Sequence, residues 1–208
     1  MRHAPVAVSI VTFNSERYIR QCLESLLSQD PAPAEIVVVD NASTDGTRGI
    51  LQDFGGRVLF LSNGDNTGYC AAHNRGIAAT TSPWVLTLNP DVVMGPGFIG
   101  ALHDAGTADP STGIVCGKLL LLNHDLSVPA APRFDSTGIY FTPELRHFDR
   151  GWGEPDDGRF DRLEYVFGAT GAAALFRREM IDDVAVDGHF FDPAFFAYRE
   201  DADVAWRA

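Results

Sequence analysis

The chain has 208 residues, of which 45% are hydrophobic and 21% are charged, so it is long enough to bury one sizeable core. Its 28 acidic and 16 basic residues give a net charge of -12, which argues against capture by nucleic acid or by an anionic membrane surface. A protein of this charge has to bind a diphosphate through a metal ion, backbone amides or a few arginines. Nucleic acid is therefore not an expected partner.

The sequence contains no recognisable leader or membrane-spanning run. Its first residues lead directly into an apolar, strand-like segment without a charged region and a cleavage site. Three cysteines, at positions 22, 70 and 116, lie far apart among apolar neighbours and lack C-x-x-C spacing, which favours buried free thiols. These features predict a cytoplasmic protein and leave peripheral membrane association open.

The first half of the chain alternates short β-branched runs with helical patterns, which is typical of βαβ units and a mostly parallel sheet. Strands are predicted at residues 6–13, 35–40, 58–61 and 84–88. Helices are predicted at residues 19–27 and 71–79, with Asn14 or Ser15 capping the first. Each predicted strand ends in a polar cluster, and ligands of open α/β sheets bind beyond the carboxyl ends of the strands. A ligand site is therefore expected at this edge.

The second half is less regular. Residues 113–122 are predicted as a further strand, after which the composition changes to Pro, Gly, Asp, Arg and aromatic residues over residues 123–164. Long loops without periodicity are uncommon unless they are functional or disordered, and the aromatic residues favour an ordered lid or acceptor wall. Regular structure is predicted to resume over residues 165–176, with a helix at 177–181 and another from Glu200. We expect one domain, 1–208, with halves 1–122 and 123–208.

Five motifs follow one another along the chain: residues 8–14 (VSIVTFN), 37–47 (VVVDNASTDGT), 88–91 (LNPD), 168–173 (GATGAA) and 191–203 (FDPAFFAYREDAD). Together they resemble glycosyltransferase family 2, and the last two resemble its rhamnosyltransferase-type branch. The resemblance extends over about residues 6–208. It implies an α/β protein with the GT-A fold, in which a Rossmann-like, mostly parallel sheet is flanked by helices and carries an irregular excursion on the acceptor side.

Asp40 ends a predicted buried strand, where an unpaired carboxylate is costly. The resemblance implies that it accepts a hydrogen bond from N3 of a pyrimidine base, with Thr12 and Phe13 beside that base and Asn14 also among the donor-binding residues. The alternative is that Asp40 caps the turn that follows it, although Asp45 is the better candidate for this structural role. We favour the base contact.

The segment that opens the second predicted helix contains small residues, which would let a ligand approach the backbone closely. The resemblance implies that Asn66, Gly68, Asn74 and Arg75 lie near the ribose or diphosphate of the donor, with Arg75 supplying positive charge. For Gly76 in the same helix, a packing role is an equally good interpretation.

Asn89-Pro90-Asp91 occupies the place of a D-x-D metal motif, of which it retains only the last acid. The resemblance implies that Asp91 holds Mg²⁺ or Mn²⁺ and that Asn89 lies on the donor side. A single carboxylate is adequate, because Mg²⁺ is commonly held by one or two carboxylates together with substrate phosphates. The competing interpretation is a simple β-turn, for which Asn-Pro-Asp is well suited.

Glu200 and Asp201 open the last predicted helix, where acids are favourable in any case. The resemblance implies that Asp201 is the base that deprotonates the acceptor, with Glu200 as a supporting acid. Asp203 is expected either to orient the loop or to bind the acceptor. Gly171, in a Gly-rich segment that lets a ligand approach the backbone, and Trp152, one of the aromatic residues of the excursion, are also expected on the acceptor side.

The reaction implied by the resemblance is an inverting, metal-dependent transfer of a sugar to an acceptor hydroxyl in cell-surface polysaccharide or glycoconjugate synthesis. The expected donor is dTDP-rhamnose, with a UDP-hexose as runner-up, and the expected acceptor is a carbohydrate or a lipid-linked glycan. The alternative is a non-catalytic nucleotide-sugar-binding or scaffold fragment. It stays open because the last helix is too short to be stable without packing and family members usually continue past this point, so the chain is expected to be truncated at its C-terminus.

Overall fold

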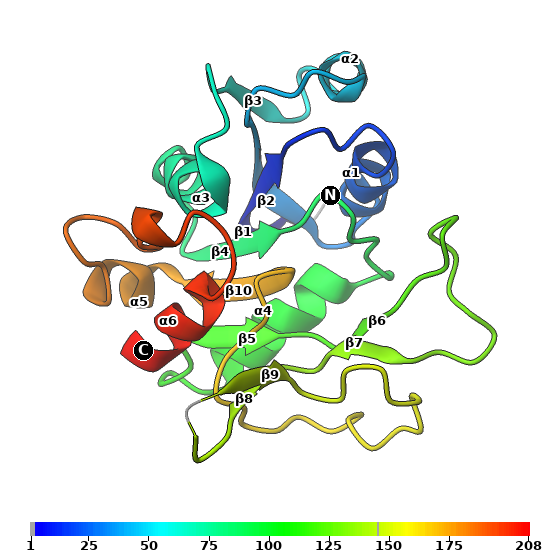
Figure 1. Ribbon diagram of the computed structural model, residues 1–208, viewed down its shortest axis with the longest axis vertical. Coiled ribbons are helices and arrows are strands. Elements are labelled where there is room, and N and C mark those ends of the chain that lie inside the picture. The colour runs from blue at the N-terminus through cyan, green and yellow to red at the C-terminus, as the bar shows by residue number, and fades with distance from the viewer. Residues whose placement is uncertain (1–2, 145) are drawn as a thin grey trace.

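The computed structural model describes residues 3–144 and 146–208 and contains a central sheet in the order β3-β2-β1-β4-β10-β5 (Figure 1). Four neighbouring strands are parallel: β1 (His3–Thr12), β2 (Ala32–Asp40), β3 (Leu59–Ser62) and β4 (Trp84–Leu88). Strand β10 (Ala173–Arg177) runs antiparallel to both β4 and β5 (Ile114–Cys116). The predicted mostly parallel sheet is thus confirmed, and the polar ends of the four parallel strands do meet at one edge.

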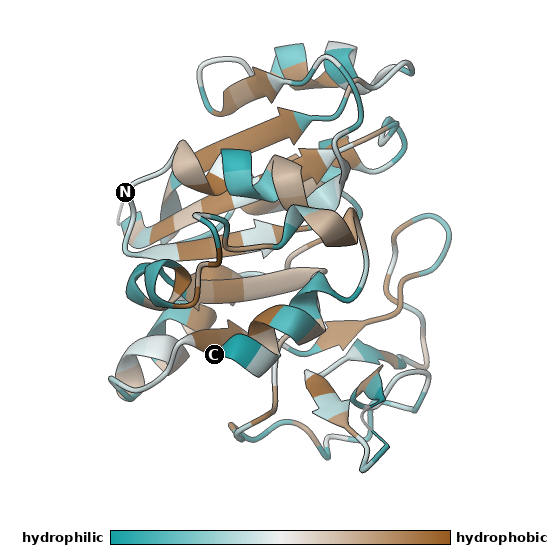
Figure 2. Ribbon diagram, turned by 60° about the vertical axis from the view of Figure 1, so that its left-hand side comes forward, coloured by the Kyte–Doolittle hydropathy of each residue, from teal (hydrophilic) through white to brown (hydrophobic). Residues whose placement is uncertain are grey.

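Helices cover both faces of the sheet. They are α1 (Ile19–Leu27), α2 (Thr47–Asp53), α3 (Gly68–Ala78), α4 (Phe98–Ala108), α5 (Arg178–Asp183) and α6 (Glu200–Arg207), and a 3-10 turn spans Pro193–Phe195. Alternate side chains of β4 face opposite sides: Leu86 lies in a core with α1, α2 and α4, whereas Val85 packs with α3, α5 and α6. Figure 2 shows the apolar strands between these two layers. Among the described residues, no helix has the length and apolarity that a membrane crossing requires.

Helix α1 has its predicted bounds, but the predicted cap is wrong. Tyr18 occupies the N-cap position without a side-chain cap hydrogen bond. The backbone carbonyl of Ser15 accepts hydrogen bonds from the amides of Tyr18 (2.9 Å) and Ile19 (3.0 Å). Asn14 has a positive φ of 50° and its side chain binds the next loop instead, so a turn separates both candidates from the helix.

The sequence patterns missed helices α2 and α4. Helix α4 contains Gly100 and Gly106, which lower helix propensity. A Cβ atom at Gly100 would lie 2.9 Å from Pro31, and one at Gly106 would lie 2.6 Å from the ring of Trp84. The glycines therefore let this helix approach the sheet closely, a requirement that only the packed structure reveals.

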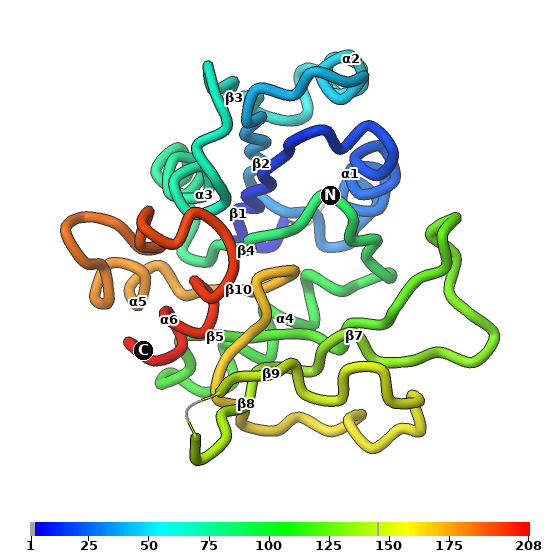
Figure 3. Tube along the Cα trace, in the orientation of Figure 1, coloured from blue at the N-terminus to red at the C-terminus, as the bar shows by residue number. Residues whose placement is uncertain are grey.

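The predicted strand at 113–122 is two strands in two sheets. Strand β5 joins the central sheet, whereas β6 (Leu119–Leu120) pairs with β7 (Phe134–Ser136). Strands β8 (Ile139–Phe141) and β9 (His147–Asp149) form a separate hairpin, and Figure 3 traces this excursion below the sheet. In the described residues, the excursion consists of these short strands joined by turns, and its role as a lid or acceptor wall stays a prediction. Regular structure resumes only at β10, and Tyr165, the predicted start, is 89% exposed.

Candidate active site

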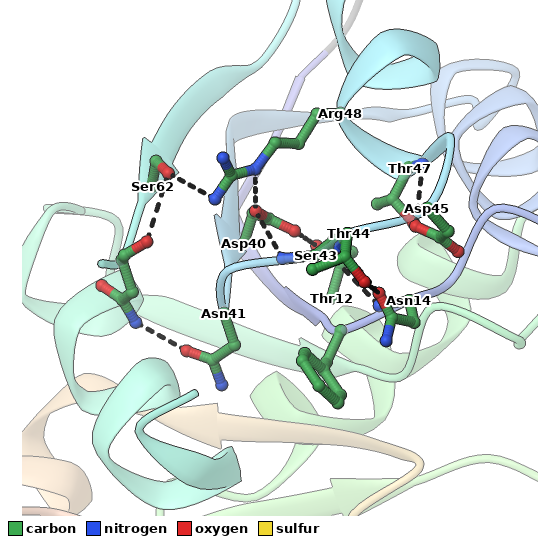
Figure 4. A network of polar contacts seen from close by, with 12 residues as sticks. Thr12, Asn14, Asp40, Asn41, Ser43, Thr44, Asp45, Thr47, Arg48 and Ser62 are labelled. Atoms are coloured by element: carbon green, nitrogen blue, oxygen red, sulfur yellow. Dashed lines mark hydrogen bonds and ion pairs between the residues drawn. The ribbon is translucent and has the colours of Figure 1, made fainter. Parts of the chain in front are cut away.

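Asp40 is the centre of a polar network at the end of β2 (Figure 4). Its fully buried carboxylate accepts hydrogen bonds from Thr12 Oγ1 (3.1 Å), from the amide of Ser43 (3.2 Å) and from Arg48 Nε (2.7 Å). Thr12 lies beside Asp40 because the two residues pair in the β1–β2 register. The bond to Ser43 is the turn-capping interaction that was the alternative interpretation. Since the side chain of Asp40 has no exposed surface, a base can reach it only if a covering group moves.

Arg48 is a residue of this network that the sequence analysis did not identify. It lies on the unpredicted helix α2, pairs with Asp40 and also donates to Ser62 Oγ at 3.2 Å. Arg75 of α3 reaches the same place, because its Nη1 donates to the backbone carbonyl of Ser62 at 2.9 Å and contacts the Asn63 amide oxygen. Two guanidinium groups thus meet at the end of β3, in a protein that is otherwise acidic. An arginine eight positions after Asp40 was the available signal.

The loops after β1 and β2 hold each other through side chain to backbone contacts, also drawn in Figure 4. The amide of Asn14 donates to Ser43 Oγ (2.9 Å), and Asn14 Oδ1 accepts from the amide of Thr44 (2.9 Å). Asp45 accepts hydrogen bonds from the amides of Glu16 and Thr47, which fits the structural role expected for it. Phe13 stands out of this network with 47% of its surface exposed.

Gly68 serves packing at the start of α3. It has a φ of +81°, and a Cβ atom there would lie 2.5 Å from the backbone oxygen of Phe196. Asn66 Oδ1 accepts from the Gly68 amide at 3.0 Å, and Asn41 Nδ2 donates to its carbonyl at 3.0 Å. The amide of Cys70 donates to the same oxygen of Phe196 at 3.2 Å, so the start of α3 packs directly against the segment that precedes α6, and Asn66 and Gly68 have partners within the protein.

Asn74 was expected to touch the donor, but both polar atoms of its amide contact another segment. Nδ2 donates to the carbonyl of Phe191 (2.7 Å), and Oδ1 accepts from the amide of the same residue (3.0 Å). The reason is that the loop before the 3-10 turn crosses α3 at this point. His73 is fully buried beside it and shares a 3.0 Å hydrogen bond with Ser9 Oγ, and burial lowers its pKa to about 3. A Cβ atom at Gly76 would lie 2.4 Å from Ser9 Oγ, which favours its packing role.

Asp91 follows β4 in an exposed turn and lines a pocket of about 650 Å³. Asp135, from β7, lines the same pocket, and its pKa is raised by burial and by the charges of Asp149 and Asp91. In residues 3–144 and 146–208, no three His, Cys, Asp or Glu side chains form a metal-binding group. Asp91 and Asp135 offer this pocket carboxylate oxygens, which are the ligands that a divalent ion takes together with the oxygens of a diphosphate.

A short backbone segment connects this turn to the start of α6. The amide of Asn89 donates to the carbonyl of Ala172 at 2.8 Å, and the amide of Gly171 donates to Asp201 Oδ2 at 3.1 Å. A Cβ atom at Gly171 would lie 3.0 Å from Glu200 Oε1, so glycine permits this close approach. The structure thus brings Asn89, Gly171, Glu200 and Asp201 close together, and their roles in donor binding and catalysis stay predictions.

Glu200 and Asp201 differ in their surroundings. Asp201 is partly exposed and also accepts a 2.7 Å hydrogen bond from the amide of Ala202. Glu200 is buried, and within the described residues its Oε2 has no hydrogen-bond partner. Burial, followed by the charge of Asp201, raises the pKa of Glu200 to about 7. Glu200 therefore carries a proton for part of the time at neutral pH.

Two predicted acceptor-side residues lie outside this constellation. Asp203 forms an ion pair with Arg207 at 2.8 Å, one turn further along α6, and Arg207 donates to the carbonyl of Phe190 at 2.7 Å. This contact anchors α6 to the preceding loop, so Asp203 has a structural role. Trp152 lies beyond β9 and lines a different pocket.

The family description Glycosyl transferase family 2 matches residues 7–185. The N-acetylglucosaminyl-diphospho-decaprenol L-rhamnosyltransferase of Mycobacterium tuberculosis is 29% identical, with 96% of this chain and 69% of that protein covered. Glycosyltransferase GlyA of Streptococcus pneumoniae is 30% identical, with 93% of this chain and 30% of that protein covered.

Solved structures share the fold. The mannosyltransferase PcManGT from Pyrobaculum calidifontis, in complex with GDP-Man and Mn2+, matches with a TM-score of 0.64 and 20% identity over 98% of this chain and 51% of its own. S. aureus TarS 1-349 in complex with UDP also matches with a TM-score of 0.64 and 20% identity. The match covers 99% of this chain and 54% of the TarS chain. The chain thus spans about half the length of these structures. It belongs to glycosyl transferase family 2, within which it resembles the rhamnosyltransferase-type branch, and it is a glycosyltransferase domain with the GT-A fold.

Proposed function

We propose that the domain transfers a sugar from a nucleotide diphosphate to an acceptor hydroxyl with inversion at the anomeric carbon. The observation that carries this proposal is the pair of hydrogen bonds at Gly171 and Ala172, because they connect the turn that leads to Asp91 and the carboxylate of Asp201 to the same short segment. Asp91 follows Asn89 on one side, and Asp201 accepts from Gly171 on the other. In a single displacement, the leaving diphosphate needs a group that stabilises its charge and the acceptor hydroxyl needs a separate group that takes its proton.

The nucleotide is assigned to the ends of β1, β2 and β3. We place a pyrimidine base against the exposed ring of Phe13, next to the Asp40–Arg48 pair. Arg75 supplies further positive charge at the same strand ends, where it holds the carbonyl of Ser62. The similarity to an L-rhamnosyltransferase supports dTDP-rhamnose as the donor, with a UDP-hexose as the next candidate.

Asp91 is assigned to Mg²⁺ or Mn²⁺, which when bound would neutralise the negative charge that develops on the leaving diphosphate. The presence of Mn2+ in the PcManGT structure supports this assignment. Asp135 lines the same pocket and adds a second carboxylate near the sugar or the metal.

Asp201 is assigned as the general base. The acceptor oxygen forms a bond to the anomeric carbon while the bond from that carbon to the phosphate oxygen breaks. The acceptor's proton passes to the partly exposed carboxylate of Asp201, which its two backbone hydrogen bonds hold in place. The acceptor is proposed to be a carbohydrate or lipid-linked glycan of a cell-surface polymer, as the name of the rhamnosyltransferase relative suggests for that protein.

Calorimetric titration with dTDP, UDP, GDP and ADP, each with and without Mg²⁺ or Mn²⁺, tests the donor site. We expect a pyrimidine diphosphate to bind in the presence of metal, and Asp91→Ala to weaken this binding by roughly tenfold or more. Asp182→Ala, which changes an exposed acid on α5, is the matched control and should bind like the unaltered protein.

The alternative function, a fragment without a competent donor site, makes the opposite prediction. A folded sample that binds none of the four nucleotides would contradict the transferase proposal and favour a scaffold role. If a nucleotide binds equally well without metal and Asp91→Ala leaves its affinity unchanged, Asp91 is not a metal ligand, whereas the nucleotide site is supported.

A further inference from the structure

The hairpin of β8 and β9 exposes aromatic rings at a second pocket. Tyr140 and Phe148 pair across the hairpin, and their rings stack with centroids 5.7 Å apart. Both side chains are exposed, and Trp152, just after β9, is 67% exposed. The three line a pocket of about 610 Å³ that shares no lining residue with the pocket at Asp91.

Trp152 lies in a turn that backbone hydrogen bonds define. It stands between Gly151 and Gly153, which have φ angles of 81° and 74°, in a turn closed by a 2.9 Å hydrogen bond from the Glu154 amide to the Gly151 carbonyl. The amide of Gly153 donates to the carbonyl of Phe134 at 2.9 Å, and Phe134 is fully buried. Because the turn is hydrogen-bonded in this position, the indole of Trp152 leaves its apolar surface exposed to water. Exposed apolar surface of this kind is typical of a binding site.

Polar groups around the rings carry both signs of charge. Asp149 and Glu154 supply carboxylate acceptors. Arg150 and Arg159 supply guanidinium donors, and both are in ion pairs, Arg150 with Glu164 and Arg159 with Glu154 and Asp157. A site for phosphate or for an anionic lipid surface would be predominantly basic. A neutral polyhydroxylated ligand, in contrast, presents hydroxyl donors and acceptors at its rim and C–H groups on its faces. The combination of exposed aromatic faces and mixed polar groups matches that chemistry.

We propose that this pocket binds a carbohydrate chain, with pyranose rings packed on Trp152 and on the Tyr140–Phe148 pair. The inference rests on the proposed function in taking the chain to be part of the acceptor. The hairpin is fixed to the transfer centre, because the amide of Ile139 donates to the carbonyl of Gly168 at 2.8 Å. Gly171, which binds Asp201, is only three residues further, at most about 11 Å of extended chain. Figure 1 shows the hairpin beside β5 and α6.

Binding is tested without nucleotide or metal. The protein is applied to an array of bacterial cell-surface oligosaccharides, and each glycan bound is titrated by calorimetry. We expect Trp152→Ala to weaken binding by roughly tenfold or more, and Trp152→Phe, which keeps an aromatic face, to retain part of it. Tyr165→Ala is the matched control, since Tyr165 is 89% exposed but lies outside this pocket.

Thermal unfolding establishes that each variant is folded. If the unaltered protein binds no glycan, or if Trp152→Ala and Tyr140→Ala both leave its glycan affinity unchanged, the proposal is wrong. Binding to vesicles of phosphatidylcholine and phosphatidylglycerol that Trp152→Ala abolishes, without glycan binding, would assign the surface to a membrane instead. The glycan-binding measurement contains no nucleotide, so it gives the same result whether or not the protein binds a nucleotide. Loss of glycan binding with nucleotide binding retained would therefore contradict this proposal alone.

Discussion

Two buried carboxylates mark the two ends of the proposed site, and their surroundings are opposite. Asp40, at the end of β2, has a cationic partner in Arg48 and two further hydrogen-bond donors. Glu200, at the start of α6, has the acid Asp201 beside it and, in the described part of the chain, an oxygen without a partner. The first arrangement stabilises a fixed negative charge, whereas the second makes the charged form costly.

This difference indicates a division of labour. A compensated carboxylate keeps one geometry, which suits recognition of a nucleotide by the strand ends. Burial raises the pKa of Glu200 to about 7, so this acid changes its protonation near neutral pH beside the candidate base, which suits proton transfer next to an acceptor. Substitutions on each side should therefore differ in what they change. Replacing the candidate base on the α6 side should change turnover, replacing Arg48 on the β2 side should lower folding stability, and replacing Glu200 should change how folding stability depends on pH.

The largest effect is expected from Asp201→Asn on the α6 side. Removing the base should lower the rate of sugar transfer by about 10²–10⁴-fold, because the acceptor's proton loses its recipient. Nucleotide affinity should change by less than about twofold, since Asp201 contacts Gly171 and its own helix rather than the strand ends. Initial rates and calorimetry on the same preparation measure both quantities. Asp203→Asn is the control within α6, and transfer that persists in Asp201→Asn at the unaltered rate would exclude Asp201 as the base.

Arg48→Ala should have the next largest effect, and on stability. It leaves Asp40 fully buried without its cation, which we expect to lower the free energy of unfolding by about 2–3 kcal/mol in urea titrations. Arg20→Ala is the matched control, because it breaks an ion pair with Asp53 in which both side chains are exposed, and it should cost less than about 1 kcal/mol. Equal losses in the two variants would contradict the difference between the two carboxylates.

Glu200→Gln should have the smallest effect and the most distinctive pH dependence. A carboxyl whose pKa rises from 4.5 to about 7 on folding holds its proton more tightly when folded. Its contribution to stability is therefore fully present below pH 4.5 and is lost as the pH rises through about 7. Glutamine stays neutral, so the variant should gain stability relative to the unaltered protein over this range, on the order of 1–3 kcal/mol by pH 8.

Urea unfolding of both proteins across this pH range measures that gain. The exposed Glu24 of α1 provides the control, and Glu24→Gln should show a nearly constant difference from the unaltered protein. A stability difference between Glu200→Gln and the unaltered protein that does not change between pH 4.5 and pH 8 would show that Glu200 is not held protonated by its surroundings.

Much of the sheet could be predicted from the sequence. Strand β4 has the predicted bounds, Trp84–Leu88, because five consecutive apolar or β-branched residues are typical of a strand buried on both faces. Helix α1 also has its predicted bounds, since its apolar residues recur at helical spacing. Periodicity of this kind is local, so no knowledge of the partner surface is needed.

The missed elements depend on partners that are distant in sequence. Helix α4 needs glycine against Pro31 and Trp84, and the run at 113–122 divides between two sheets because β6 pairs with β7. The glycines of α4 lower its local helix propensity, so the sequence argues against this helix. Strand propensity over residues 113–122 is the same whether the run forms one strand or two.

The sequence by itself determined which residue types stand at the strand ends, and therefore the family and the candidate acids Asp40, Asp91 and Asp201. Only the tertiary structure decided which of the predicted side chains are paired with other groups of the protein. Asn74 forms hydrogen bonds with the backbone of Phe191, Asp203 forms an ion pair with Arg207, and Asp40 forms an ion pair with Arg48. The physical reason is that a polar side chain takes its role from the partner that packing places within hydrogen-bond distance, and these partners lie on other elements or beyond the motif that carries the resemblance.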